Sequence, residues 1–276
     1  MLTPDENYIA KHYGTAVFQF ELERLEKHCP VEYATTCRYL EKYVPPGAIV
    51  ADVGVGVGHY AAFLAQRGCT VYLIDISVQL LDAARQRLES AGLENLIKGI
   101  HKASAKDLYC LDNGSLDAIL MLGPLYHLRE LRERQQAVRE AQRVLKPDGV
   151  LFAAGINRLA YLRDLFRESP KEVIERKRFH EDFLRGGKLD PHHAPPIGYA
   201  HLTTVTEFRE LFTECFEELA LVGTESFTTA WQSKLHELSP EERDAWLDLV
   251  EQTGRTPEGL GQSDHFLFVG KRRSEI

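Results

Sequence analysis

Three glycines at alternate positions follow a short apolar segment that carries an acidic residue. The segment is Ile49–Val53, Asp52 lies near its end, and Gly54, Gly56 and Gly58 come next. Because glycine has no Cβ atom, a ligand can lie directly against the backbone of such a turn. A strand, a glycine turn and a helix, in that order, are typical of a site for a nucleotide cofactor.

The glycine spacing leaves two classes of nucleotide cofactor open. Residues Gly56–Ala61 (GVGHYA) match the GxGxxA pattern of dinucleotide-binding turns. Asp52 disfavours a dinucleotide, because a carboxylate at the end of this strand would repel a pyrophosphate but attract a cationic amino group. Asp75, at the end of the next apolar segment, could accept hydrogen bonds from both ribose hydroxyls of either cofactor.

Other side chains that could do chemistry follow the fourth apolar segment. Tyr126 and His127 come just after residues 116–122, at the sheet edge where α/β sites assemble. His127 could act as a general base, and Tyr126 could orient a substrate with its hydroxyl. Alternatively, Tyr126 packs over the cofactor and His127 only helps to begin the next helix. Tyr13 and Tyr199 could close over the bound substrate, or belong to ordinary packed helices.

Three histidines in a stretch rich in proline and glycine could suggest a metal site. They are His192, His193 and His201, and Asp190 lies beside them. Their spacing matches no known set of metal ligands. We therefore expect solvated or substrate-facing histidines and no bound metal.

Strands and helices that could position these residues alternate over the first 155 residues. Apolar runs predict strands at 49–53, 70–74, 96–101, 116–122 and 150–154. Apolar residues at helical spacing predict helices at 59–67, 80–91 and 129–145. This alternation predicts βαβ units, and hence a parallel sheet with right-handed crossovers.

The alternation breaks after residue 155. The sequence predicts charge-rich helix at 157–185, an irregular loop at 186–196, helix at 204–212, a strand at 216–222, a helix at 240–252 and a last strand at 265–270. Ser239 and Pro240 are favoured residues for the start of the helix at 240–252.

The composition favours a globular protein of the cytoplasm. The chain has 276 residues, 44% of them hydrophobic, and its net charge of −8 disfavours general binding to nucleic acid. The N-terminus lacks the pattern of a signal peptide, and no segment is apolar enough to span a membrane. The five cysteines form no CxxC pair, which is typical of a reducing compartment.

Five segments, in their order and spacing, resemble class I S-adenosylmethionine-dependent methyltransferases. The matching segments are Val50–Gly58, Leu73–Ser77, Ala103–Leu108, Leu116–Leu120 and Arg143–Gly149. Residues 123–128 (GPLYHL) are similar to a string of a bacterial subgroup in the small-molecule branch. The resemblance implies an α/β fold with a Rossmann-like, mostly parallel seven-stranded sheet, its last strand antiparallel and helices on both faces.

The resemblance also implies one methyltransferase domain in three parts. We expect a helical N-terminal cap at 1–45, a cofactor-binding core at 46–155 and 216–271, and a lid or acceptor-side insertion at 156–215.

The resemblance assigns the cofactor contacts residue by residue. The turn with Gly54, Gly56 and Gly58 would hold the methionine part of S-adenosylmethionine, and Asp52 would reach its ammonium group. Asp75 would bind the ribose. Three further residues complete the set: Ile76 packing on the adenine, the Ala105 backbone reading the adenine edge, and Leu122 under the methionine portion.

Ser104 departs from the family pattern. Many relatives carry an acid there, and that acid accepts a hydrogen bond from the adenine amino group. A serine hydroxyl can still accept this hydrogen bond, but without charge assistance the loss could be about 1 kcal/mol. Asp107 could compensate for the missing acid.

We therefore expect S-adenosylmethionine-dependent methyl transfer, by in-line displacement, to an oxygen or nitrogen of a small-molecule acceptor. Tyr126 and His127 are the candidate catalytic residues, and Tyr13 and Tyr199 join them as candidate substrate-binding residues. The protein could form a homodimer, and we expect neither a membrane nor a nucleic-acid partner. The alternatives are an RNA or protein methyltransferase, a non-catalytic S-adenosylmethionine-binding protein, and an NAD-dependent dehydrogenase.

Overall fold

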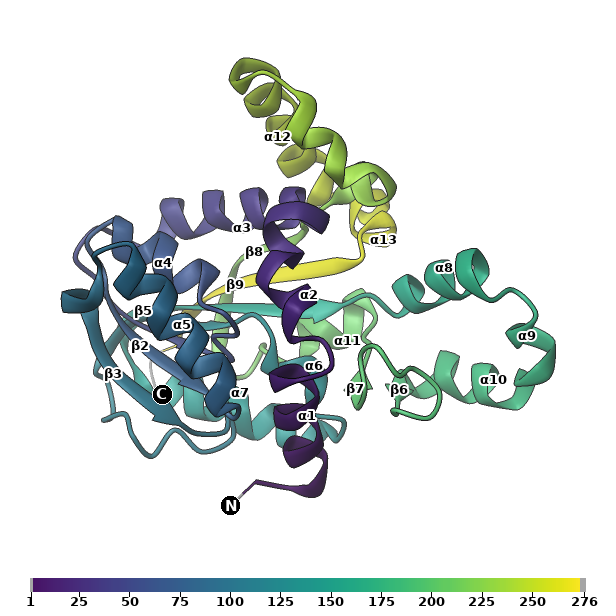
Figure 1. Ribbon diagram of the computed structural model, residues 1–276, viewed down its shortest axis with the longest axis horizontal. Coiled ribbons are helices and arrows are strands. Elements are labelled where there is room, and N and C mark those ends of the chain that lie inside the picture. Colours follow the sequence, from purple (N-terminus) through teal and green to yellow (C-terminus); the bar gives the residue numbers. More distant parts are fainter. Residues whose placement is uncertain (1, 274–276) are drawn as a thin grey trace.

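A seven-stranded sheet forms the centre of the computed structural model, which describes residues 2–273 (Figure 1). Its strands are β1 Ile49–Val53, β2 Thr70–Asp75, β3 Ile97–Lys102, β4 Leu116–Met121, β5 Leu145–Ile156, β8 Phe216–Gly223 and β9 His265–Arg272. The strand order is β3-β2-β1-β4-β5-β9-β8. The first five strands pair in parallel, and β9 pairs antiparallel with both β5 and β8. The predicted fold class is therefore confirmed.

Helices cover both faces of the sheet. One face packs against α3 Pro30–Tyr43, α4 His59–Gln66 and α5 Val78–Ser90, and the other against α7 Leu131–Val144 and α11 Val205–Glu210. Successive strand residues supply the two cores alternately, because side chains of a strand point to opposite faces. Val50 belongs to the core under α4 and α5, and its neighbour Ala51 to the core under α7.

The N-terminal segment forms two short helices that run beside the sheet edge (Figure 1). They are α1 Pro4–Gly14 and α2 Phe18–Glu23, and a π-helical turn, η1 Arg24–His28, follows. Thr3 and Glu6 form a capping box, in which each side chain bonds the other residue's backbone N–H. This box fixes where α1 begins, and therefore which α1 residues face the core.

An arm of three helices and a small hairpin projects from the end of β5 (Figure 1). It comprises α8 Arg158–Glu168, α9 Glu172–Glu175, α10 Lys177–Gly186, β6 Lys188–Leu189 and β7 Ala200–His201. The segment 157–185, predicted as helical, is interrupted at Ser169, because a residue before proline disfavours helical backbone. Strand β6 lies within the predicted irregular loop at 186–196 and pairs antiparallel with β7, and the arm has an apolar cluster of its own around Phe183.

The C-terminal part adds two helices that the sequence did not predict. They are η3 Ser226–Glu237, a 3₁₀ segment, and α13 Pro257–Gln262. Between them lies α12 Pro240–Gly254, where the Ser239 side chain accepts a hydrogen bond from the Glu242 N–H as predicted. No helix within residues 2–273 is both long and apolar enough to cross a membrane.

Candidate active site

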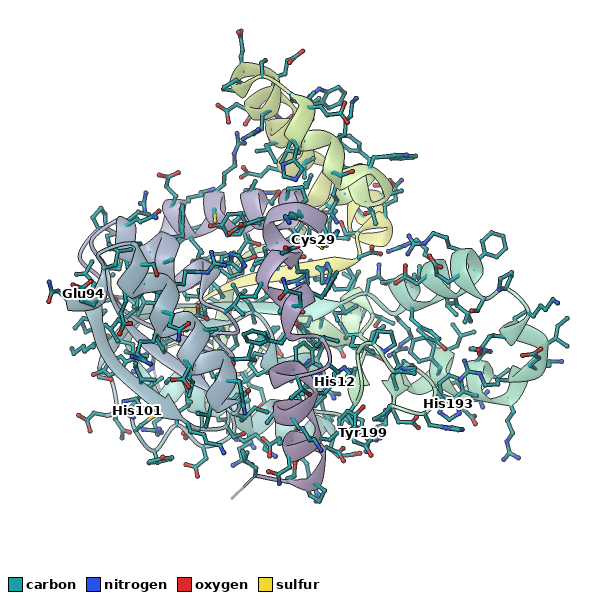
Figure 2. The ribbon with its side chains drawn as sticks, in the orientation of Figure 1. His12, Cys29, Glu94, His101, His193 and Tyr199 are labelled. Atoms are coloured by element: carbon teal, nitrogen blue, oxygen red, sulfur yellow. The ribbon has the colours of Figure 1, made fainter. Side chains whose placement is uncertain are left out.

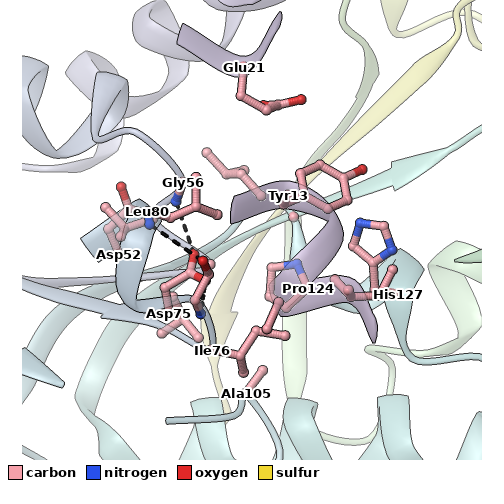
Figure 3. Close-up of a pocket in the computed structure, with 18 of the residues that line it drawn as sticks. Tyr13, Glu21, Asp52, Gly56, Asp75, Ile76, Leu80, Ala105, Pro124 and His127 are labelled. Carbon is pink, nitrogen blue, oxygen red and sulfur yellow. Dashed lines mark hydrogen bonds between the residues drawn. The ribbon is translucent and has the colours of Figure 1, made fainter. Parts of the chain in front are cut away.

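A cavity opens where β1, β2 and β4 end at the same edge of the sheet (Figure 3). Its volume, including the opening, is about 1070 Å³. Parts of α1 and α2 form the opposite wall. The predicted site residues that line it are Tyr13, Asp52, Gly54, Gly56, Asp75, Ile76, Ser104, Ala105, Leu122, Tyr126 and His127. Gly58 and the Tyr199 side chain do not line it.

Two glycines of the turn, Gly56 and Gly58, have different structural roles. Gly56 has φ +54°, a built Cβ there would meet open space, and its N–H donates to Asp75 Oδ2 at 3.1 Å. Gly58 has φ +85° and precedes α4, and a Cβ there would lie 2.9 Å from Ala84 Cα. Gly58 therefore lets α4 pack closely on α5, while Gly56 leaves the backbone open to a ligand.

Asp52 is a buried carboxylate with an oxygen left without a partner. The residue is 2% exposed, and Oδ2 makes no hydrogen bond to any described residue. Burial, together with the charge of Asp75, raises the pKa of the Asp52 carboxyl to about 7. An unpaired buried acceptor is costly, so this oxygen fits a ligand that brings an ammonium group.

Asp75 is held in one orientation by the backbone around it. Its Oδ2 accepts from Gly56, and its Oδ1 accepts from the Ser77 N–H at 2.8 Å. Burial raises the pKa of its carboxyl to about 6, against the opposing effect of these backbone hydrogen bonds. Each oxygen keeps a lone pair, so the two could accept the two hydroxyls of a ribose.

The end of the cavity near Ile76 and Ala105 contains an acid that sequence reasoning missed. Glu6 of α1 lines this end, and the Ser104 hydroxyl donates to Glu6 Oε1 at 2.5 Å. The Thr-x-x-Glu spacing could have revealed the start of α1, but not that the glutamate faces a residue 98 positions away. Asp107 is exposed and lies outside the cavity.

Two tyrosines and a histidine form the other end of the cavity. The Tyr13 ring lies 5.1 Å from that of His127, and the Tyr126 ring lies 4.8 Å from it, both edge to face. Neither tyrosine hydroxyl makes a hydrogen bond to the described residues. Burial raises the pKa of both tyrosines, so both hydroxyls keep their protons and can donate to a ligand.

His127 has its tautomer set by a backbone carbonyl. Its Nδ1 lies 2.8 Å from the Tyr199 carbonyl oxygen, which can only accept, so Nδ1 carries the proton. Burial lowers the pKa of His127 to about 4, so the ring is neutral and Nε2 keeps a free lone pair. Tyr199 therefore reaches the site through its backbone. Its ring packs outside the cavity on Tyr8 and Arg129.

The N-terminal segment brings two more charged residues that sequence reasoning did not single out. Glu21 and Arg24 line the cavity, and Figure 3 shows Glu21 on the wall opposite the strands. Arg24 Nη1 lies 2.8 Å from Glu32 Oε2. Behind this pair, His265 Nδ1 lies 2.6 Å from Glu225 Oε1. The charges of Glu32 and Glu225 outweigh burial and raise the pKa of His265 to about 9.

The histidines of the arm lie apart from this cavity. His193 Nδ1 lies 2.9 Å from Asp190 Oδ1, and the His193 ring stacks on that of Phe179. His201 Nε2 lies 3.4 Å from Arg134 Nη2. Figure 2 places His193 well out along the arm, away from His12 on α1. Within residues 2–273, the group close enough to share a metal ion is Glu32, Glu225 and His265, and its ligand atoms are engaged by Arg24 and by one another.

Comparisons with known proteins match part of the chain to a known domain. Residues 51–153 match a family model described as a methyltransferase domain. This match lies in the predicted cofactor-binding part of the chain, and it confirms the predicted resemblance to class I S-adenosylmethionine-dependent methyltransferases and the cofactor that the resemblance implies. The assignment of residues 123–128 to a particular subgroup stays a prediction.

Curated relatives match the same part of the chain. Methyltransferase GfsG of Streptomyces halstedii is 40% identical over 114 residues, which are 41% of this chain and 39% of that protein. A ubiquinone biosynthesis O-methyltransferase of Xanthomonas oryzae pv. oryzae is 34% identical over 113 residues, 41% of this chain and 44% of that protein. The chain thus matches less than half the length of these relatives.

Solved structures share the fold over most of the chain. A SAM-dependent methyltransferase from Methanosarcina mazei superposes with a TM-score of 0.59 and 22% identity, covering 86% of this chain and 98% of that one. The N-methyltransferase NodS from Bradyrhizobium japonicum, solved with S-adenosylhomocysteine, superposes with a TM-score of 0.54 and 14% identity. The match covers 91% of each chain.

Proposed function

We propose that the protein transfers a methyl group from S-adenosylmethionine to an oxygen or nitrogen of a small-molecule acceptor. The observation that carries this proposal is the unpartnered Oδ2 of Asp52 on the wall of the cavity. A pyrophosphate would meet repulsion there, whereas an amino-acid ammonium would satisfy the carboxylate. The domain match supports the same cofactor.

The residues along the cavity fit the parts of this cofactor. Asp52 would bind the ammonium group, Asp75 would accept the ribose hydroxyls, and Ile76 with the Ala105 backbone would enclose the adenine. Gly54, Gly56 and Leu122 would line the methionine portion. When bound, the cofactor supplies a methyl group on a sulfonium, which is a good leaving group for in-line displacement.

The tyrosines and the histidine would position the acceptor. Tyr13 and Tyr126 offer two hydroxyl donors, and His127 Nε2 offers one acceptor toward a hydroxyl or amine proton. Because burial lowers the pKa of His127 to about 4, His127 would orient that proton more readily than remove it completely. Correct placement and exclusion of water would then supply most of the acceleration.

The N-terminal cap and the arm would enclose the acceptor. Tyr13 and Glu21 of the N-terminal helices line the cavity, which supports a cap at 1–45. The hydrogen bond between His127 and the Tyr199 backbone supports an acceptor-side role for the insertion at 156–215.

The five free cysteines support the proposed cytoplasmic location, where thiols stay reduced.

Isothermal titration calorimetry with S-adenosylhomocysteine and with NADH would test the cofactor. We expect S-adenosylhomocysteine to bind and NADH not to bind, and the opposite result would contradict the proposal. Mass spectrometry of reactions with hydroxylated and amine-bearing small molecules would then identify the acceptor. Binding of RNA that weakens steeply with salt would favour a macromolecular substrate instead.

A further inference from the structure

Glu6 is a buried carboxylate, and charged side chains are seldom buried. It is 6% exposed and belongs to α1, yet it lines the cavity beside Ser104 and Ala105. Burial alone would raise the pKa of the Glu6 carboxyl. Hydrogen bonds from Ser104 and Thr3, with the charge of Lys106, outweigh burial and hold that pKa below its ordinary value. The buried group is therefore ionised at neutral pH.

The two Glu6 oxygens have different partners. Oε2 accepts from the Thr3 N–H at 2.8 Å and the Thr3 hydroxyl at 3.0 Å, and lies 3.2 Å from Lys106 Nζ. Oε1 accepts one hydrogen bond, from the Ser104 hydroxyl. A carboxylate oxygen can accept two hydrogen bonds, so Oε1 keeps one lone pair, and Glu6 lines the cavity.

Ser104 cannot donate to a ligand while this arrangement holds. Its proton is given to Glu6, and its oxygen accepts from the Lys106 N–H at 3.2 Å. Ser104 and Glu6 together therefore present acceptors only. A ligand edge that carries an N–H donor satisfies them, whereas an edge that carries a carbonyl oxygen leaves a buried carboxylate opposed by another acceptor.

We propose that Glu6 accepts a hydrogen bond from the exocyclic amino group of the cofactor's adenine, with Ser104 fixing the carboxylate. This inference rests on the proposed function. It assigns base recognition to the N-terminal helix, so that α1 is part of the cofactor site, and it predicts discrimination between a 6-amino and a 6-oxo purine.

Calorimetry with S-adenosylhomocysteine and its deaminated counterpart, S-inosylhomocysteine, tests the proposal. The wild-type protein should prefer the amino form by about 10- to 100-fold, because one unpaired charged group at a buried site has an effect of this order. Glu6→Gln should reduce this preference by about tenfold, since the amide can turn its N–H₂ toward a carbonyl.

Glu133→Gln is the matched control. Glu133 pairs with the same Lys106, at 2.8 Å, but does not line the cavity, so this variant should keep the wild-type preference. Ser104→Ala provides a second test in which Glu6 stays charged, and the preference should persist in weaker form.

The outcomes separate the inference from the function on which it rests. If the wild-type protein binds neither purine form, the proposed function fails. If it binds S-adenosylhomocysteine but Glu6→Gln keeps the full preference, the inference is overturned and the function stands. Equal loss of affinity for both forms in a folded Glu6→Gln protein would mean that Glu6 only holds α1 in place, which also overturns the inference.

Discussion

Two carboxyl groups that line the cavity, Asp52 and Asp75, have raised pKa values. Burial raises the pKa of Asp52 to about 7 and that of Asp75 to about 6. In the unfolded chain both groups lose their protons near pH 4, so between about pH 4 and pH 7 the folded protein binds more protons than the unfolded one. The contribution of these two groups to the free energy of unfolding of the ligand-free protein should therefore fall as the pH rises through this window, and Asp52→Asn should reduce that dependence in urea denaturation.

Binding of the cofactor should show the opposite dependence on pH. The proposed contact with the ammonium group needs an ionised Asp52, and with a pKa of about 7 the ionised fraction rises about tenfold from pH 6 to pH 8. The affinity for S-adenosylhomocysteine, measured by calorimetry, should rise by a similar factor. Asp52→Asn cannot ionise and should bind weakly with a flat profile, and an unchanged slope in that variant would assign the effect to another group.

Asp75 should contribute directly to cofactor affinity. Asp75→Ala removes two acceptors from the proposed ribose position, so the dissociation constant of S-adenosylhomocysteine should rise by an amount that corresponds to about 1–3 kcal/mol. Asp82→Ala is a suitable control, because Asp82 is exposed on α5 and pairs with Arg85. An unchanged affinity in Asp75→Ala would mean that Asp75 does not bind the ribose.

At the scale of elements, a buried ionic cluster joins the N-terminal segment to the last strand. Arg24 of η1 pairs with Glu32 of α3, and His265 of β9 pairs with Glu225, which is 0% exposed. The His265 pKa of about 9 lies above its unfolded value, so its contribution to stability is present below about pH 6.5 and is lost as the pH rises through 9.

Removing His265 should therefore destabilise the protein most at low pH. His265→Ala leaves the Glu225 carboxylate buried without its partner, which should reduce the free energy of unfolding by about 3–5 kcal/mol near pH 6. Urea denaturation would measure this loss, and it should shrink above about pH 9. The exposed His236→Ala serves as the control. A loss that does not depend on pH would mean that His265 acts through packing alone.

The strands of the core could be predicted because their signal is local. β1 Ile49–Val53 was predicted with both ends correct, since an apolar run buried on both faces stops at a glycine turn. The 3₁₀ segment Ser226–Glu237 was missed, because its mixture of polar and aromatic residues has no regular period. Its burial depends on contacts such as Gln232 with Glu32, 200 residues away.

Of the residues that line the cavity, the sequence could predict mainly those that belong to the sheet core or follow its strands. Asp52 and Asp75 lie at the ends of β1 and β2, and Ala105 lies just beyond β3, so the order of the strands fixes their place. Glu6, Glu21 and Arg24 lie on a segment whose position over the core depends on distant partners. The distances between these partners in sequence, such as 98 residues for Glu6 and Ser104, leave no local pattern.

At the scale of the whole molecule, polar contacts and the buried Ile9 hold the N-terminal helix over the cavity. Asp5 pairs with Arg129 at 2.7 Å, Glu6 bonds Ser104, and His12 lies 3.0 Å from the Pro196 carbonyl of the arm. These contacts join the cap to both the core and the arm. Because isolated polar contacts stabilise weakly, the cap should open more readily than the sheet.

A bound cofactor should close this cap. S-adenosylhomocysteine would lie between the core and α1, so binding should slow hydrogen exchange of backbone amides in residues 4–28 as well as in the glycine turn. Exchange in α12 Pro240–Gly254, which does not line the cavity, should stay the same and serves as the internal control. Slower exchange confined to the glycine turn would show that the cofactor binds the core alone, and that the cap instead responds to the acceptor.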